Sequence, residues 1–348
     1  MLVTNEVSLS QHADDVHGLW RRNLTGMSHT DPSAKLRLGY LENPAGEGIG
    51  IALRTGDGNA AVGVICLHPR SMHHGLTELR AANLADFAVD TAYRTLGPAL
   101  LLMKEAVAHA GRRAVLLYGL PNRSSAAVCR RAGLHVQSGG LLRYARVLNG
   151  EHPSVQEWSP ALRALLTPAV GAALWIAELW RALTLKPHLR VTAASFDDPA
   201  LETIWARRPQ DLLLGERTPA MVRWRYGHIG RGDWSVCLAR TSSGEAVGTL
   251  VWRLRDGVAD IGDFFSIDPR RMTASMLNAF CLFVRPLGAH SVSLEFFGAT
   301  EVVEQLGRAG LRCRGEASAV VMDIAAIGMP ELAAAERWYL TAFDNDAD

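Results

Sequence analysis

The sequence predicts an α/β protein with a mixed, mostly antiparallel sheet flanked by helices, arranged as two tandem domains of one fold. Short strings recur in the same order about 180 residues apart, which is the signature of an internal duplication. These strings are R-x-x-Y at 37–40 and 223–226, AVG at 61–63 and 246–248, DF at 86–87 and 263–264, and RAGL at 131–134 and 308–311. In each half, strand-like runs come first and then alternate with helix-like segments.

The first half contains the clearest pattern of elements. Alternating and β-branched runs predict strands, and amphipathic runs bounded by Gly, Pro or Asn predict helices. We expect helices at 11–24, 32–43, 97–110 and 123–133, and strands at 48–54, 61–68, 76–89, 114–120 and 141–148.

The second half repeats this order. We expect helices near 199–208 and 218–228, strands near 234–240, 246–254 and 258–267, and then a helix, a strand at 291–297, a helix at 300–310 and a strand at 318–324. The resulting division is a first domain at 1–149, a helical linker at 150–190, a second domain at 191–326, and a C-terminal helix with an acidic tail at 327–348.

Composition limits the class of protein. A length of 348 residues fits two domains. The 36 basic and 35 acidic residues balance, so net charge does not indicate a nucleic-acid partner. The five cysteines are scattered without metal-ligand spacing, and the N-terminus lacks the pattern of a secretion signal. We therefore expect a cytoplasmic protein with no metal and no disulfide framework.

The most apolar segment, 161–184, is shorter between its charged residues than a membrane span requires. A buried or interdomain helix explains it. An interfacial helix with Trp175 and Trp180 at a membrane surface is the alternative, so peripheral membrane association through 161–184 stays open.

The string RTLGPA, Arg94–Ala99, stands where the strand at 76–89 leads into a helix. A helix N-terminus presents unpaired backbone N–H groups and the positive end of the helix dipole, which together bind anions. Gly97 allows a ligand to approach the backbone closely, and Arg94 adds a charged donor. The loop therefore predicts a phosphate or pyrophosphate site.

Here the sequence resembles the GCN5-related N-acetyltransferase (GNAT) superfamily, whose [QR]-x-x-G-x-[GA] loop follows the fourth strand and binds the pyrophosphate of acyl-CoA. RTLGPA matches that loop, and PNRSSAAVCRRAGL resembles the family in placing an Asn at the end of the fifth strand and an Ala on the helix that follows. The resemblance implies two tandem GNAT-like domains and acetyl-CoA or another acyl-CoA as co-substrate. The implied cofactor-binding residues are Phe87, Ala88, Val89, Arg94, Thr95, Leu96, Gly97, Pro98, Ala99, Asn122 and Ala126.

GYLENP and LLYGLPN also resemble strings in acetyltransferases of bacterial exopolysaccharide clusters. Two residues depart from the family pattern. Pro98 lacks an N–H, and Cys129 stands where many members have the Tyr that protonates the departing thiolate. Cys129 is therefore a candidate acid, with a packing residue as the alternative reading. In the second half, Ala274 and Met276 align with Gly97 and Ala99, so we expect one acyl-CoA site, in the first half.

The catalytic base and the acceptor contacts are sought on the same strand. Asp86 is the candidate base, although Asp263 recurs at the equivalent place in the second half and points to a structural role. Glu78, with His73 and His74 at the hairpin tip, are candidate acceptor contacts, and a solvated turn is the alternative for the two histidines.

The resemblance implies an acyltransferase that moves the acyl group directly to an amine or hydroxyl of a small molecule or sugar. A Fem-type aminoacyltransferase and a non-catalytic CoA-binding or scaffold protein are the alternatives. The acceptor, the choice between N- and O-transfer, and the acyl length stay open.

Overall fold

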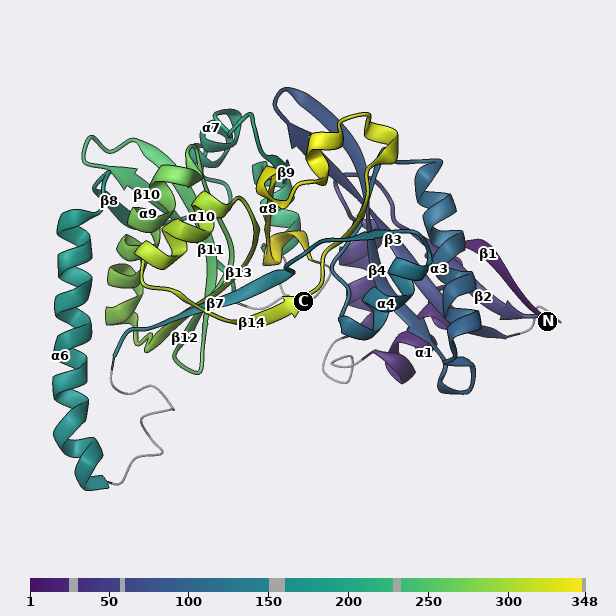
Figure 1. Ribbon diagram of the computed structural model, residues 1–348, viewed down its shortest axis with the longest axis horizontal. Coiled ribbons are helices and arrows are strands. Elements are labelled where there is room, and N and C mark those ends of the chain that lie inside the picture. The colour runs from purple at the N-terminus through teal and green to yellow at the C-terminus, as the bar shows by residue number, and fades with distance from the viewer. Residues whose placement is uncertain (25–30, 57–59, 150–159, 228–232, 346–348) are drawn as a thin grey trace.

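The computed structural model describes residues 1–24, 31–56, 60–149, 160–227 and 233–345, and the backbone alone for 160–170. Its elements form two halves side by side, with helices on the faces of the sheet (Figure 1). The strand order along this sheet is β6-β15-β5-β4-β3-β9-β16-β13-β12-β11-β10-β8. Most neighbours are antiparallel, and the pairs β4–β5, β12–β13 and β9–β16 are parallel. The predicted fold class is confirmed.

The first half has a sheet between two helical layers. Helices α3 and α4 cover one face, packing on Ile65 and Leu67, and α1 covers the other, packing on Val64 and Cys66. The alternation follows from the two-residue period of a strand. The elements are β1 Leu2–Ser8, α1 Ala13–Asn23, α2 Pro32–Leu36, the π-helical η1 Arg37–Leu41, β2 Ile49–Thr55, β3 Ala61–His74, β4 Thr77–Val89, η2 Thr91–Tyr93, α3 Leu96–Gly111, β5 Leu116–Gly119, α4 Arg123–Arg131, β6 His135–Val136 and β7 Leu141–Val147.

The second half repeats the order of three antiparallel strands, helix, strand, helix and strand. It follows the long helix α6, Pro160–Thr184. The elements are β8 Leu189–Ala194, α7 Ala200–Ala206, β9 Leu213–Gly215, α8 Pro219–Tyr226, β10 Ser235–Thr241, β11 Ala246–Arg255, β12 Val258–Ser266, α9 Pro269–Val284, η3 Arg285–Leu287, β13 Ser291–Gly298, α10 Thr300–Arg308 and β14 Arg312–Ser318.

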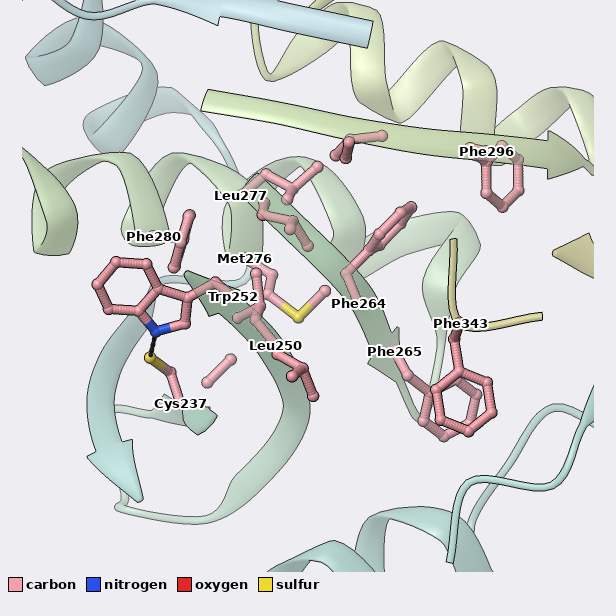
Figure 2. Close-up of a cluster of buried hydrophobic side chains, with 14 of the residues drawn as sticks. Cys237, Leu250, Trp252, Phe264, Phe265, Met276, Leu277, Phe280, Phe296 and Phe343 are labelled. Atoms are coloured by element: carbon pink, nitrogen blue, oxygen red, sulfur yellow. Dashed lines mark hydrogen bonds between the residues drawn. The ribbon is translucent and has the colours of Figure 1, made fainter. Parts of the chain in front are cut away.

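The packing of this half centres on aromatic and aliphatic side chains from β11, β12 and α9 (Figure 2). Trp252 is stacked edge-on against Phe280 at 5.5 Å, and its indole N–H donates to the Cys237 sulfur. Phe264 and Met276 are fully buried beside them. Each such side chain stabilises the fold by roughly 1.5–3 kcal/mol, so this cluster is a main source of stability.

The two halves exchange strands. β7 leaves the first half and pairs with β13 and β14 of the second. In return β15, Val321–Asp323, pairs with β5 and β6 of the first half. Each sheet is therefore completed by a strand from the other half, which the sequence pattern did not predict.

The C-terminal segment differs from the predicted helix at 327–348. Gly328 has φ +72, and the helical pieces of this segment are short 3-10 turns: η4 Ala325–Ile327, η5 Pro330–Ala333, η6 Ala335–Arg337 and η7 Ala342–Asp344. Between them β16, Trp338–Thr341, pairs with β13 and β9. Gly and Pro stop a helix here, and the apolar run Trp338–Leu340 is buried as a strand. The end of the acidic tail, 346–348, and the linker residues 150–159 lie outside the described part.

The exchange gives a testable prediction. A chain of residues 1–149 alone should be insoluble, because β7 then lacks both of its partners and the edge of β5 stays unpaired. Co-expression with 150–348 should restore a soluble complex that elutes as one peak in size-exclusion chromatography. A soluble, monomeric 1–149 fragment would contradict the exchange.

Candidate active site

The site begins where two parallel strands separate. β4 and β5 pair from Ala81–Leu116 to Leu84–Gly119, and beyond this point β4 continues along β3 alone. Helices α3 and α4 start at this edge. The carboxyl ends of parallel strands beside helix N-termini form the usual ligand crevice of α/β sheets.

A bulge shapes β4 at this opening. The register of β4 against β3 shifts between Val64 and Cys66, so that two residues of β4, Asp86 and Phe87, lie opposite a single residue of β3. Asp86 has φ +48, a left-handed conformation that Asp tolerates better than most residues. A bulge leaves backbone N–H groups unpaired in the ladder. Phe87, Ala88 and Val89, predicted to lie along the acyl group, follow the bulge directly.

The predicted anion loop lies at the N-terminus of α3. The first helical bond runs from the Ala99 N–H to the Thr95 carbonyl, so the amides of Leu96 and Gly97 precede the intrahelical ladder. A Cβ at Gly97 would meet nothing within 4 Å. Pro98 is half-buried and has no N–H. The exposed amides of this turn can therefore receive a phosphate.

Arg94 does not point into the loop as a phosphate donor. Its Nε and Nη2 both donate to the Val89 carbonyl at 3.2 Å, and Nη2 also donates to Asn23. Asp90 accepts from Arg22 and Asn23. Burial alone would raise the pKa of Asp90, but these hydrogen bonds hold it below its ordinary value. The hydrogen bonds of Arg94 and Asp90 thus stabilise the turn that leads from β4 into α3.

The three predicted residues on α4 have different environments. Asn122 caps the helix by accepting from the Ser125 N–H, and Ala126 is buried. Cys129 is 1% exposed in the core, where burial raises the pKa of its thiol to about 12. Such a thiol is a poor acid toward a thiolate whose conjugate acid has a pKa near 8.5. The burial of Cys129 therefore favours the alternative reading, a packing residue, over the predicted acid role.

Asp86 is held by two side chains that precede it in the sequence. The Lys35 ammonium lies 3.0 Å from Oδ1, and the Tyr40 hydroxyl donates to Oδ2. Both carboxylate oxygens are engaged and the pair is nearly buried, so Asp86 is poorly placed to accept a proton. The structure favours a positioning role at the bulge over the predicted role as base.

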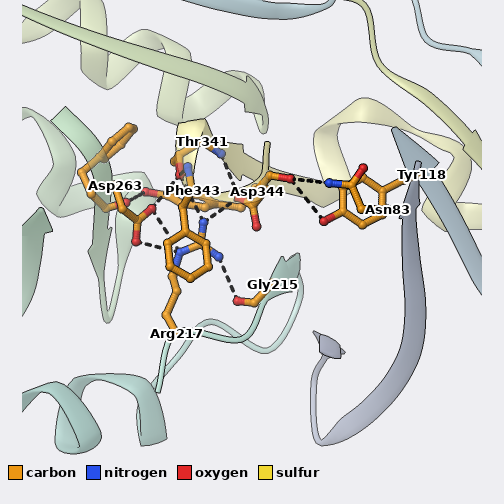
Figure 3. A network of polar contacts seen from close by, with 10 residues as sticks. Asn83, Tyr118, Gly215, Arg217, Asp263, Thr341, Phe343 and Asp344 are labelled. Carbon is orange, nitrogen blue, oxygen red and sulfur yellow. Dashed lines mark hydrogen bonds and ion pairs between the residues drawn. The ribbon is translucent and has the colours of Figure 1, made fainter. Parts of the chain in front are cut away.

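Asp263 is held in the same manner in the second half (Figure 3). Arg217 donates to both of its oxygens and to Asp344, and Thr341 donates to Oδ1. Burial, opposed by Arg217, raises the pKa of Asp263. An aspartate paired with a cation at the equivalent strand position in both halves indicates a shared structural role.

The opening in the second half is closed. β12 and β13 separate after Ile261–Leu294, and β16 pairs with the end of β13 and fills the space. The Tyr339 hydroxyl donates to the Phe264 carbonyl on β12. The loop is also lost, because Ile267–Asp268 alone connect β12 to α9, and Ala274 and Met276 lie buried inside that helix.

The predicted acceptor contacts lie elsewhere. His73 and His74 pair with Leu214 and Leu213 of β9, and the His73 ring packs edge-on against Trp205. Desolvation, with Arg208 nearby, lowers the pKa of His73. Glu78 accepts from Ser71, and about eight strand residues, or roughly 26 Å, separate it from Asp86. This hairpin joins the two halves through β9, its turn at Leu76 is exposed to solvent, and the contacts of the two histidines favour a packing role over acceptor binding.

A cavity of about 470 Å³ lies in the second half, and we call it the seam cavity because the exchanged strand β7 contributes to its lining. Arg143, Ser293 and Glu295 line it from β7 and β13, and Tyr226, Trp234 and Asn345 line other walls. Arg143 pairs with Glu295 at 2.8 Å. The adjacent Trp224 donates to the Leu38 carbonyl in η1, the element whose Tyr40 contacts Asp86. A chain of contacts through η1 therefore connects α8, which lines part of the cavity, with Asp86 at the β4 bulge.

The sequence patterns missed Lys35, Arg217, Asp344 and this cavity. Lys35 carried a signal, because it is one of only three lysines in an arginine-rich chain. No cluster of His, Cys, Asp or Glu that could hold a metal ion occurs among the residues described. Within the same residues, no helix is long and apolar enough to cross a membrane.

Neither protein-family models nor curated proteins match the sequence. Solved structures do match. A GCN5-related N-acetyltransferase from Anabaena variabilis superposes with a TM-score of 0.64 at 12% identity, covering 93% of this chain and 73% of that one. The chain has the GNAT fold. A GCN5-related N-acetyltransferase from Kribbella flavida gives a TM-score of 0.56 at 16% identity, covering 92% and 70%.

Saccharomyces cerevisiae N-myristoyltransferase with bound myristoyl-CoA matches over 92% of this chain and 82% of its own, with a TM-score of 0.52 at 10% identity. The similarity to these solved structures thus extends over both halves of the chain. At these identities the shared property is the fold, and the roles of single residues rest on the geometry above.

The Asp86 pair gives a prediction of its own. Asp86→Asn should lower the free energy of unfolding by about 3 kcal/mol, because the Lys35 ammonium then lacks its buried counter-charge. The double variant Lys35→Met with Asp86→Asn should recover most of that loss in a urea denaturation. The exposed pair Arg37–Glu42 is the control, and Arg37→Ala should cost less than about 1 kcal/mol. Unchanged stability with lost turnover in Asp86→Asn would restore Asp86 as the base.

Proposed function

We propose that the protein is an acyl-CoA-dependent acyltransferase with one active and one degenerate half. The observation that carries the proposal is the contrast between the two strand openings. Between β4 and β5 the described residues leave a bulge and the exposed N-terminus of α3, whereas β16 fills the opening between β12 and β13. The contrast supports the proposed division into an acyl-CoA domain within 1–149 and a second domain within 191–326.

The co-substrate would bind with its pyrophosphate on the Leu96 and Gly97 amides and its acyl arm along Phe87–Val89. An acceptor amine or hydroxyl attacks the thioester carbonyl, the carbon–sulfur bond breaks, and the acceptor proton ends on the released CoA thiol. Backbone N–H groups at the β4 bulge are placed to stabilise the developing oxyanion. Acetyl transfer is the proposed reaction, since the GCN5-related neighbours are N-acetyltransferases by name.

The seam cavity is the proposed acceptor site. The cavity is lined by two ion pairs, Arg143–Glu295 and Arg253–Asp260, and by the ring of Trp234. Such a lining suits a small polar acceptor, for example an amino sugar, better than an alkyl chain. Nothing in the charge balance favours nucleic acid, which argues against the Fem-type alternative that uses aminoacyl-tRNA. A cytoplasmic site of action completes the proposal.

Calorimetric titration with acetyl-CoA tests the cofactor site. The wild type should bind with micromolar affinity, about −8 kcal/mol, and Gly97→Trp should abolish binding by covering the amides. Gly111→Trp, at the opposite end of the same helix, is the matched control, because a Cβ there also meets nothing within 4 Å. If no acyl-CoA binds the wild type, or if both variants lose binding alike, the proposed site is wrong. Such a result would favour the alternative that the protein is a non-catalytic scaffold.

The acceptor site needs a separate test. Ser293→Phe should fill the cavity and raise the KM of an amino-sugar acceptor at least about tenfold, while the Kd of acetyl-CoA stays unchanged. Ser235→Phe, on the exposed start of β10, is the control. CoA release in the presence of glucosamine reports turnover. An unchanged KM in Ser293→Phe would place the acceptor outside this cavity.

A further inference from the structure

Helix α6 has its apolar and charged faces reversed relative to an ordinary surface helix. A surface helix normally turns its apolar stripe inward and its charged residues outward. In the part with described side chains, the outward positions of α6 are apolar, and its charged residues Glu178 and Arg181 face the protein. Figure 1 shows the helix along the outer edge of the second half.

Glu178 fixes this orientation. Its side chain is 0% exposed, although it lies on an edge helix. Oε1 accepts from Arg146 of β7 at 2.9 Å, and Oε2 accepts from Arg285 at 2.8 Å. Asn278 of α9 donates to the Glu178 backbone carbonyl. Rotating the apolar face inward would break a buried ion cluster, which is strongly unfavourable.

The outward face carries large apolar side chains at helical spacing. Trp175, Ile176, Leu179, Trp180 and Leu183 are 50%, 61%, 37%, 65% and 73% exposed. They recur at intervals of three and four residues and so form one continuous face. Two exposed tryptophans on one such face are unusual in water and are favoured at the boundary between lipid headgroups and acyl chains.

Positive charge flanks this face at its C-terminal end. Lys186 follows the helix and is exposed, as is Arg190 in β8. The only acidic side chain in Gly171–Lys186 is the buried Glu178. An apolar face bordered by cations is complementary to an anionic membrane surface.

We propose that α6 is an interfacial helix that docks the protein on anionic phospholipid bilayers through Trp175, Ile176, Leu179, Trp180 and Leu183. The helix lies in the plane of the membrane and does not cross it, in agreement with the absence of a spanning helix from the residues described. The inference is independent of the acyltransferase proposal.

Vesicle co-sedimentation tests the proposal with the full chain. The wild type should bind vesicles of phosphatidylcholine with phosphatidylglycerol, and bind pure phosphatidylcholine more weakly. Binding should weaken as salt rises, because the basic flank is screened. Trp180→Ser with Leu183→Ser should lower the vesicle partition coefficient at least about tenfold. Leu76→Ser with Leu254→Ser, two exposed leucines elsewhere, is the matched control and should bind as the wild type does.

Tryptophan fluorescence gives a second readout, which uses conservative Trp-to-Phe substitutions. Brominated lipids should quench part of the tryptophan emission of the wild type, and Trp175→Phe with Trp180→Phe should remove that quenching while binding persists. The proposal is overturned if the wild type binds neither kind of vesicle, or if the control pair loses as much binding as the α6 pair. It is equally overturned if sedimentation shows a dimer that the α6 pair dissociates, since a second copy then covers the face.

Discussion

The buried cation of Arg217 is the interaction on which the arrangement of the two halves depends. It is 1% exposed and binds Asp263 on β12 and Asp344 after β16, and these carboxylates raise its pKa although burial alone would lower it. A buried guanidinium without such partners would be severely destabilising. The same Asp344 offers its backbone carbonyl to Asn83 of β4 and Tyr118 of β5. One residue of the C-terminal segment thus ties the second half to the strands that form the candidate acyl-CoA site.

These contacts of Arg217 and Asp344 explain why the strand opening is filled in the second half and not in the first, although the elements of the two halves recur in one order. The segment that Arg217 holds is continuous with β16, so fixing Asp344 also fixes β16 in the opening between β12 and β13. The equivalent cation in the first half, Lys35, stands on α2 and pairs with Asp86, and the opening beside it stays unfilled by any described strand. A recurring aspartate–cation pair therefore supports both bulged strands, and the C-terminal segment decides which opening a ligand can enter.

The sequence patterns predicted much of this, because local signals determine local structure. The alternation of apolar and polar residues with a period of two predicted β3 and β4, and Gly97 with Pro98 predicted the start of α3. What failed depends on contacts between residues distant in the chain. No local signal says that β7 pairs with β13 and not with β5, or that Trp338–Leu340 forms a strand when its partners lie elsewhere. Arg94 was predicted to bind phosphate from its position alone, but its guanidinium donates to the Val89 carbonyl and to Asn23.

The exchanged strand β7 also links the two proposed binding surfaces. Arg146 of β7 holds Glu178 and so orients α6, and Arg143 of the same strand lines the seam cavity. Because β7 is paired on both sides, with β13 and β14, it cannot shift without breaking two ladders. The cavity therefore keeps a fixed orientation relative to the apolar face of α6. A bilayer that binds this face would then determine how the proposed acceptor site is presented, and the strand exchange is the structural reason that it can do so without a hinge.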